Sequence, residues 1–325
     1  NENNKKNRVL IMSNILITGG CGFVGRQLAQ DLQPKHNILL VDDLSNNQSY
    51  IPKYGKFLKG NIGDEKIAKK VFKNIDYCIA LASRKGAIGY VNRHPTEILT
   101  ENNKIYNSTF KYCIKYKVKK IIFISSSMVF EGSKKYPTPE SYIKETPVPL
   151  SPFGLSKYIG ENYCRNFNKE YGLKYVIIRP SNVYGVGEKP EKLVGDSHVI
   201  PDMTKKILKS KGSIDVLGSG KQTRCFIHVK DLSNAISKCL SNKIYNTDFN
   251  VGGSQEYSIN QIIDKIKNII SPKIKIKKKY IPSYSDDVKR QYMNCSKAKK
   301  KLKWRENIKF NKGLGEMVRW LKNRI

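Results

Sequence analysis

The sequence predicts an α/β fold in which a doubly wound parallel sheet is followed by a smaller C-terminal domain. From residue 13 to about residue 180, short β-rich segments alternate with amphipathic helical segments, which is typical of a parallel sheet covered by helices. The first β-rich segment runs into the glycine-rich TGGCGFVG, and the next one ends in an acidic residue. Strand, glycine turn, helix, strand and acid in this order indicate a Rossmann-type sheet that binds a dinucleotide.

The remaining elements follow from the hydrophobic periodicity. Strands are expected at 15–18, 38–42, 56–60, 76–82, 120–126 and 175–180. Helices are expected between them, notably at 23–32, 95–117 and 153–171. After Pro180 the alternation breaks down, although a helix is expected after Pro201 and amphipathic helices return at 258–270 and 311–323.

These segments divide the chain into two expected domains. A dinucleotide-binding domain takes residues 1–185, and residues 224–252 return to it. The other segments, 186–223 and 253–325, form a substrate-binding cap over the carboxyl ends of the strands, where open α/β sheets bind their ligands.

The composition narrows the class of protein. With 325 residues and 39% hydrophobic residues, the chain can bury a large core. No apolar stretch reaches the roughly 18 residues that span a bilayer, and the first twelve residues lack the features of a secretory signal. We therefore expect a cytoplasmic protein with no membrane partner. Seven scattered cysteines without a CxxC pair argue against a zinc site and a disulfide framework, so we expect no metal.

The net charge of +33 also requires an interpretation. A nucleic-acid-binding protein concentrates such charge in an arm or on one face, with aromatic residues between the charges. Here the lysines are spread through the chain, so we interpret them as a solvated surface and expect no nucleic-acid partner. Nucleic-acid binding stays open as a weaker alternative, and a positive field would also attract an anionic substrate.

The glycine motif has a physical role at each position. Gly19 lets the chain turn sharply, Gly22 leaves no side chain between the backbone and a diphosphate, and Gly25 lets the helix pack on the sheet. Asp42 can accept hydrogen bonds from both hydroxyls of an adenosine ribose, and no arginine follows to receive a 2′-phosphate. The motif therefore predicts NAD rather than NADP. The alternative is an ordinary strand, turn and helix whose glycines serve packing alone.

Further motifs point to one family. Together with TGGCGFVG, the chain resembles the extended short-chain dehydrogenase/reductases, specifically their NAD-dependent sugar-nucleotide epimerase/dehydratase branch. The resemblance covers nearly the whole chain and includes SSSMVF (125–130), FGLSK (153–157), RPSNVYG (179–185), GSGKQTRCFIHVKD (218–231), FNVGG (249–253) and SKAKKKLKW (296–304).

The resemblance implies three catalytic positions. In such enzymes a serine or threonine and a tyrosine share the proton of a sugar hydroxyl while hydride passes between the sugar and the nicotinamide. Ser126 matches the hydroxyl partner, and Lys157 matches the lysine that holds the nicotinamide ribose. The tyrosine position is Phe153, and Tyr158 does not repair the motif because Asn162, not a lysine, lies four residues after it.

Phe153 is the largest departure from the family pattern, because a phenyl ring can neither donate nor accept a proton. We favour a deliberate Tyr-to-Phe replacement, since the other motifs are intact and Phe is the isosteric change that traps a substrate. A natural loss of the chemistry, and compensation by Ser126 or Ser127, are the alternatives.

The resemblance also implies the residues that bind the two ligands. The cofactor residues are Gly19, Gly22, Phe23, Val24, Gly25, Asp42, Asn61, Ile62, Leu81, Ala82, Ser83, Lys157 and Pro180, with Asn102 or Asn103 and Ser181 on the nicotinamide side. The substrate residues are Ser127, Met128, Asn182, Arg224, Arg290 and, as a weaker candidate, His198. Arg224 and Arg290 could instead be surface ion-pair residues.

The residues after Ser126 separate the possible reactions. Related 4,6-dehydratases usually have Asp and Glu there, decarboxylases a Glu and 3,5-epimerases a Cys, whereas this chain has Ser127 and Met128. We therefore expect a sugar-nucleotide 4-epimerase acting through a 4-keto intermediate. The alternatives are a 4-dehydrogenase, a 4,6-dehydratase-like enzyme and a catalytically silent nucleotide-sugar-binding protein.

The sequence indicates the partners of the protein less precisely than its reaction. The segment at 86–95 is similar to that of the GDP-mannose 3,5-epimerases and GDP-fucose synthases, which keeps a GDP-sugar open beside a UDP-sugar. Relatives commonly pair through the helix that begins near Phe153 and the helix before it, so we expect a homodimer by analogy.

Overall fold

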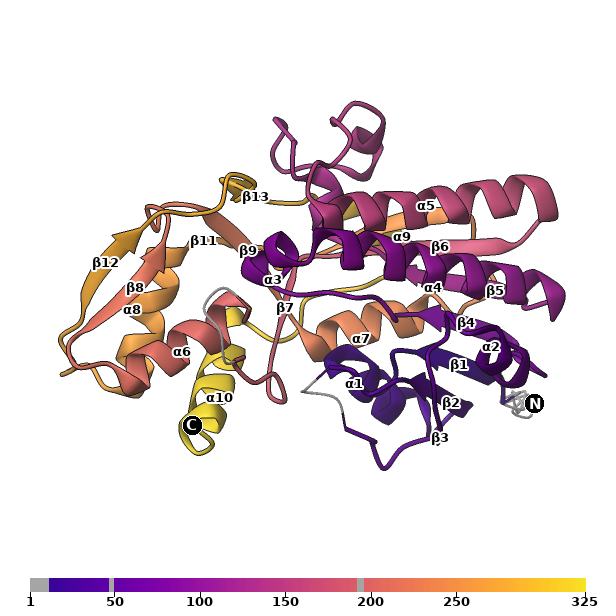
Figure 1. Cartoon of the computed structure of the whole chain (residues 1–325), viewed down its shortest axis with the longest axis horizontal. Helices are drawn as coiled ribbons and strands as arrows, with labels where there is room; N and C mark the ends of the chain where they lie inside the picture. The colour runs from indigo at the N-terminus through magenta and orange to yellow at the C-terminus, as the bar shows by residue number, and fades with distance from the viewer. Residues whose placement is uncertain (1–11, 47–49, 192–195) are drawn as a thin grey trace, which may run out of the picture.

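The structure, a computed structural model, describes residues 12–46, 50–191 and 196–325. The expectation for the first twelve residues therefore lies almost entirely outside the described part of the chain. A central sheet with helices on both faces forms the larger half of the molecule, and short sheets and helices form the smaller half (Figure 1). None of the described helices is both long enough and apolar enough to cross a membrane.

The central sheet contains seven parallel strands in the order β10-β6-β5-β4-β1-β2-β3. Their bounds are Asn14–Thr18 (β1), Asn37–Asp42 (β2), Lys56–Lys59 (β3), Tyr77–Ala80 (β4), Lys120–Ile124 (β5), Lys174–Pro180 (β6) and Thr247–Val251 (β10). The strand order reverses between β1 and β4, and a ligand of such a sheet binds at the carboxyl ends beside this point.

Helices on both faces confirm the doubly wound fold. Ile15 and Ile17 of β1 pack in a core with α1 (Phe23–Leu32) and α7 (Val229–Lys238). Leu16, whose side chain points to the other face, packs in a core with the helices α2 (Glu65–Val71), α4 (Pro95–Lys115) and α5 (Pro152–Tyr171). Burial on both faces explains why β1, β4 and β5 are continuous apolar segments.

The smaller half contains two further sheets. β7 (Asn182–Tyr184), β9 (Thr223–His228), β11 (Glu256–Ser258) and β13 (Arg290–Gln291) form one, and β8 (Ser213–Leu217) pairs with β12 (Lys277–Ile281) in the other. Three helices share a core with them: α6 (Val199–Lys209), α8 (Ile259–Ile270) and α10 (Phe310–Lys322). The chain re-enters the larger half through α7 and β10, while β9 pairs with β7. The division into domains stays a prediction.

The strands and helices expected by residue range are present, with ends that differ by at most two residues, but the strands β7–β13 were not predicted, among them β10 of the central sheet. The helix placed after Pro201 begins at Val199, because proline is well tolerated in the first turn, where its missing N–H is not needed. The sequence analysis did not predict α7, which His228 caps by accepting a hydrogen bond from the Lys230 N–H at 3.3 Å. Histidine is not a usual cap residue. The shorter elements are α3 (Ile88–Arg93), α9 (Ser296–Lys301) and the 3₁₀ helices η1 (Ser127–Phe130) and η2 (Glu140–Lys144).

Candidate active site

The turn between β1 and α1 forms the first part of the site. Gly19 has a φ of +68°, and a Cβ there would lie 2.9 Å from the backbone of Ala82. A Cβ on Gly25 would lie 2.6 Å from the carbonyl oxygen of Gly19. Gly22 caps α1 without a side chain, so the first N–H groups of the helix face the open turn. Backbone donors and the positive end of the helix dipole suit a diphosphate.

Asp42 closes β2 beside this turn. Its Oδ2 accepts a hydrogen bond from the Cys21 N–H at 3.0 Å, and its Oδ1 accepts one from the Leu44 N–H at 2.8 Å. Burial raises the pKa of this carboxyl above its ordinary value, and the two backbone donors oppose that shift. The carboxylate is only partly covered, so its remaining lone pairs can accept hydrogen bonds from ribose hydroxyls.

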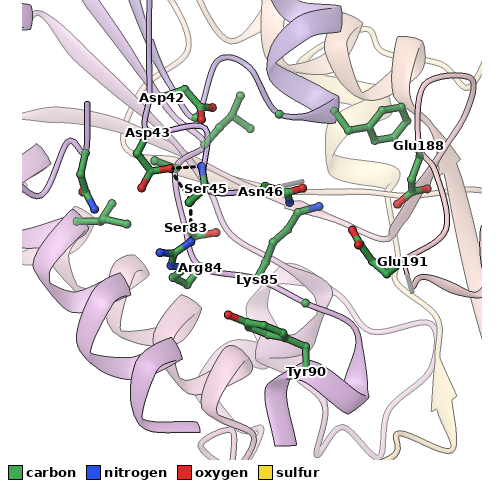
Figure 2. Close-up of a pocket in the computed structure, with 18 of the residues that line it drawn as sticks. Asp42, Asp43, Ser45, Asn46, Ser83, Arg84, Lys85, Tyr90, Glu188 and Glu191 are labelled. Atoms are coloured by element: carbon green, nitrogen blue, oxygen red, sulfur yellow. Dashed lines mark hydrogen bonds between the residues drawn. The ribbon is translucent and has the colours of Figure 1, made fainter. Parts of the chain in front are cut away.

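Arg84 borders the same end of the cleft, although the sequence analysis did not predict it. Its guanidinium donates to Ser45 Oγ at 2.6 Å, and Ser45 Oγ in turn donates to Asp43 (Figure 2). Asn102 is fully buried and holds the Arg84 backbone through its amide, at 2.6 Å and 3.0 Å. Asn102 was expected beside the nicotinamide and has a supporting position instead. The signal in the sequence was the position of Arg84, four residues after the end of β4, where the carboxyl ends of the strands meet the cleft.

These residues surround a cavity of about 310 Å³ that fits the adenosine and diphosphate parts of a dinucleotide. Lys85 extends into this cavity toward Asn46, with Glu188 and Glu191 on its far side (Figure 2). The expected cofactor residues that line it are Gly19, Gly22, Phe23, Asp42, Asn61, Ile62, Leu81, Ala82 and Ser83. A turn without side chains at the start of a helix and a carboxylate at the end of β2 are the groups with which a sheet of this kind binds a dinucleotide.

A second cavity of about 370 Å³ adjoins the first. Both are lined by Gly22, Phe23, Ser83, Lys85 and His198, so the two form one continuous cleft. The second cavity brings together the other expected residues: Val24, Gly25, Ser126, Ser127, Met128, Phe153, Lys157, Pro180, Asn182 and Arg224. Of the residues predicted for the site, Arg290, Asn102 and Asn103 line neither cavity, and the others line the cleft.

Lys157 projects from α5 into the second cavity. Its Nζ donates to the carbonyl oxygen of Ile124 at 2.9 Å and to Ser83 Oγ at 3.2 Å. Burial, with a smaller contribution from the charge of Lys85, lowers the pKa of Lys157 to about 7. Ser126 follows β5 beside it and caps η1, its Oγ accepting from the Met128 N–H at 3.1 Å. The amine and the hydroxyl therefore line the same cavity near the end of β5.

A buried ion-pair cluster supports these two residues from behind. Glu161, one helical turn after Lys157, accepts two hydrogen bonds from Arg179, at 2.6 Å and 2.7 Å. It also accepts one from Ser125 Oγ at 2.8 Å. Arg179 lies 2.9 Å from Asp248 of β10. Arg179 holds the pKa of Glu161 below its ordinary value despite complete burial. The cluster fixes α5, β5 and β6 relative to one another.

Phe153 lies in the first turn of α5, where the tyrosine of the family motif would be. Ser151 caps this helix, its Oγ accepting from the Gly154 N–H at 3.1 Å, and Glu131 accepts a hydrogen bond from the Ser151 N–H at 2.8 Å. The Phe153 ring is half-buried, and its centre lies 5.6 Å from Lys157 Nζ. Among the described residues that line the second cavity, none is a tyrosine. The position is built as in the family, but without the phenol.

The two arginines assigned to the substrate lie in different places. Arg224 lines the second cavity, has a side chain that is 13% exposed and pairs with Asp287 at 2.9 Å. Arg290 does not line the cavity but pairs with Glu256 at 2.9 Å on an exposed edge. Side chains alternate along β13, so Gln291, not Arg290, faces the cavity. The assignment of Arg290 to the substrate is therefore not supported.

Gln291 joins several predicted residues at the substrate end, although the sequence analysis missed it. Its Oε1 accepts from Asn182 Nδ2 at 3.1 Å, and its Nε2 lies 3.5 Å from the sulfur of Met128. His198 caps α6 at the junction of the two cavities and pairs with the buried Glu188. In the described part of the chain, no three His, Cys, Asp or Glu side chains come together as a metal site.

Comparisons with known proteins agree with this geometry. A sequence model described as the NAD dependent epimerase/dehydratase family matches residues 15–252. A putative UDP-glucose 4-epimerase of Methanocaldococcus jannaschii is 32% identical, over 95% of this chain and 98% of that protein.

Two solved structures have the same fold over nearly the whole chain. UDP-glucose 4-epimerase from Thermotoga maritima, with UDP-glucose, has a TM-score of 0.87 at 29% identity, covering 96% of this chain and 99% of that one. A Tyr-to-Phe mutant of UDP-glucuronic acid 4-epimerase from Bacillus cereus, in complex with UDP-4-deoxy-4-fluoro-glucuronic acid and NAD, has a TM-score of 0.86 at 25% identity, covering 96% of this chain and 100% of that one.

Proposed function

The chain belongs to the NAD-dependent epimerase/dehydratase family, and from that premise we propose that it is a UDP-sugar 4-epimerase that acts through a 4-keto intermediate. The cofactor is NAD. One observation carries the proposal: the cleft joins a complete dinucleotide site to a cavity whose reactive groups are the hydroxyl of Ser126 and the amine of Lys157. The 4-epimerases among its relatives support the same reaction.

One set of cleft residues binds the cofactor, and another binds the substrate. The N–H groups at the start of α1 hold the cofactor diphosphate, Asp42 holds the adenosine ribose, and Lys157 holds the nicotinamide ribose. When bound, NAD⁺ supplies the acceptor for the hydride from the sugar C4. Ser126 binds the sugar hydroxyl that loses its proton, and Arg224 binds the substrate diphosphate.

Met128 favours chemistry at C4 over chemistry at C5 or C6. Elimination of water, or removal of a carbon-bound proton, requires an acid or a base beside Ser126. Met128 lies there with its sulfur against Gln291 and can serve as neither. Oxidation at C4 needs only a group that accepts the hydroxyl proton. A 4-dehydrogenase would share that step and differ in releasing an oxidised sugar.

A second candidate is a catalytically silent nucleotide-sugar-binding protein, which Phe153 favours. The Phe153→Tyr variant separates the two functions when it is assayed with UDP-glucose, UDP-N-acetylglucosamine, UDP-glucuronate and GDP-mannose. We expect it to raise C4 epimerisation of at least one donor about 10²- to 10⁴-fold over the parent, since a positioned proton-transfer group contributes that much.

The matched control is Phe153→Leu, which also alters the ring but provides no phenol. Its turnover should not exceed that of the parent chain. If the Phe153→Tyr variant converts none of the donors while still binding NAD and a nucleotide sugar by calorimetry, the enzyme proposal is wrong and the silent binding function is supported.

We also propose a homodimer formed through α4 and α5. These two helices lie side by side on one face of the sheet (Figure 1). The outer side of α5 leaves Leu155 and Ile159 partly exposed beside Tyr163, and such apolar residues suit an interface. Light scattering on the full chain measures the mass directly, and a Leu155→Glu, Ile159→Glu variant should be a monomer.

A further inference from the structure

The amine of Lys157 has two protein acceptors and one side open to the cavity. An ammonium group has three hydrogens to donate, whereas a neutral amine has two and keeps a lone pair. Two protein acceptors contact Nζ, the Ile124 carbonyl oxygen at 2.9 Å and Ser83 Oγ at 3.2 Å. If a neutral Lys157 donates its two hydrogens to these acceptors, its lone pair points toward the cavity.

Aromatic rings cover the other sides of the amine. The ring centres of Tyr106, Phe123 and Phe153 lie 5.7, 5.5 and 5.6 Å from Nζ. Ring faces attract a cation, but three of them also exclude the water that an ammonium group needs. A tyrosine at position 153 would place a polar oxygen at this ring. Phe153 removes it and makes the surroundings of Lys157 more apolar.

The charged groups around Lys157 also oppose a second positive charge. Lys85, from the segment after β4, lines the same cavity and lowers the pKa of Lys157 in addition to the effect of burial. Glu161, which also lies on α5, forms ion pairs with Arg179 and Arg165. The segment after β5 contributes the hydroxyls of Ser125 and Ser126 to the cavity, and α4 contributes Tyr106, whose buried phenol has a pKa raised above its ordinary value. In the described part of the structure, no carboxylate forms an ion pair with Lys157.

We propose that Lys157 is the proton acceptor of this chain, resting as a neutral amine and taking the role for which the cavity has no phenol. The inference rests on the proposed C4 chemistry. As the C4–O bond becomes a carbonyl, the C4–H electron pair leaves as hydride and the O4 proton reaches Nζ through the hydroxyl-lined cavity. Nζ becomes an ammonium, and it returns the proton when hydride returns to C4.

The resting state is measured without turnover, by NMR of the full chain with lysine labelled with ¹³C at Cε. The signal that disappears in a Lys157→Met variant belongs to Lys157, and its shift against pH gives the pKa. We expect a midpoint near 7, against about 10.4 for an ordinary lysine. A Lys157 signal that stays fully charged up to about pH 9 would overturn the proposal.

The role in proton transfer is tested by the Lys157→Arg variant, because a guanidinium keeps the charge and the donors but does not become neutral. In the parent chain we expect this change to lower the formation of NADH from bound NAD⁺ and substrate at least about 100-fold. In the Phe153→Tyr background the loss should be at least tenfold smaller than in the parent, since the phenol then accepts the proton and only the ribose contact of Lys157 is altered. The parent reaction should also rise with pH through the midpoint of Lys157.

A second buried lysine provides the matched control. Lys120 donates to the carbonyl oxygens of Ser241 and Ile244, and burial lowers its pKa to about 8, but it does not line either cavity. Lys120→Arg should leave NADH formation unchanged. The proposal is wrong if the Lys157→Arg variant forms NADH as fast as the parent. It is also wrong if the parent forms no NADH with a sugar that the Phe153→Tyr variant converts. If neither the parent nor the Phe153→Tyr variant converts any donor, the proposed function is wrong instead. The NMR titration still measures the protonation state of Lys157 in that case.

Discussion

The two ends of the cleft differ in how closely they follow the family pattern. At the dinucleotide end, Gly19, Gly22, Gly25 and Asp42 follow the pattern of a dinucleotide-binding turn. At the sugar end, the first turn of α5 is capped, but Phe153 lies at the position of the family's tyrosine. Cofactor binding depends largely on backbone geometry, whereas the reaction depends on a group that accepts a proton. Membership of the family therefore establishes the first end more firmly than the second.

The supporting residues show the same contrast. Behind the sugar end, Glu161 and Arg179 are fully buried and paired, which is costly to build and is needed to hold Ser125 and α5 in place. The supporting residues are therefore in place around Phe153, a ring that carries no proton-transfer group. The following changes test that view, from the largest expected effect to the smallest.

The largest effect is expected at Arg224, the buried cation of the sugar end. Arg224→Ala should weaken the binding of UDP by about 2–5 kcal/mol, because truncation of a buried charge pair leaves Asp287 unpaired beside an anion. Isothermal titration calorimetry with UDP measures the loss. Arg290→Ala is the matched control: its ion pair with Glu256 is exposed, so UDP affinity should change less than twofold. Equal losses in both variants would show that the substrate reaches the exposed edge.

A smaller effect is expected at Gly25, in the turn of the dinucleotide end. In Gly25→Ala the new Cβ would lie 2.6 Å from the Gly19 carbonyl oxygen, so the backbone of the turn must shift. Overpacking of this kind costs about 1–3 kcal/mol, and NAD affinity should fall about 10- to 100-fold. Gly132→Ala, whose Cβ has ordinary contacts at 3.4 Å, should bind NAD like the parent. Unchanged NAD binding by Gly25→Ala would mean that the turn does not hold the cofactor.

The sequence predicted the parts of the site that depend on local pattern. The glycine turn and Asp42 lie within one strand-turn-helix-strand unit, so their spacing alone places them together. Arg224 and Arg290 lie far along the chain, and which of them faces the cleft depends on the pairing of β13 with β9. Gln291 was missed for the same reason, because the side-chain alternation of a two-residue strand is set by its neighbours. The low pKa of Lys157 depends on rings from three elements and has no signal in the sequence.

The smallest effect is expected for the pH dependence of NAD binding. Burial raises the pKa of Asp42, so its carboxylate takes up a proton at a higher pH than an ordinary carboxyl does. The charged form accepts more strongly from ribose hydroxyls, and NAD affinity should therefore fall as the pH is lowered through this pKa. Asp42→Asn removes the titration and should weaken NAD binding at neutral pH about tenfold, since hydrogen bonds to a charged group are stronger than those to an amide. Asp64→Asn, at the exposed cap of α2, is the control. If NAD binding by the Asp42→Asn variant falls at low pH as it does in the parent, then Asp42 is not the group that controls cofactor binding at low pH.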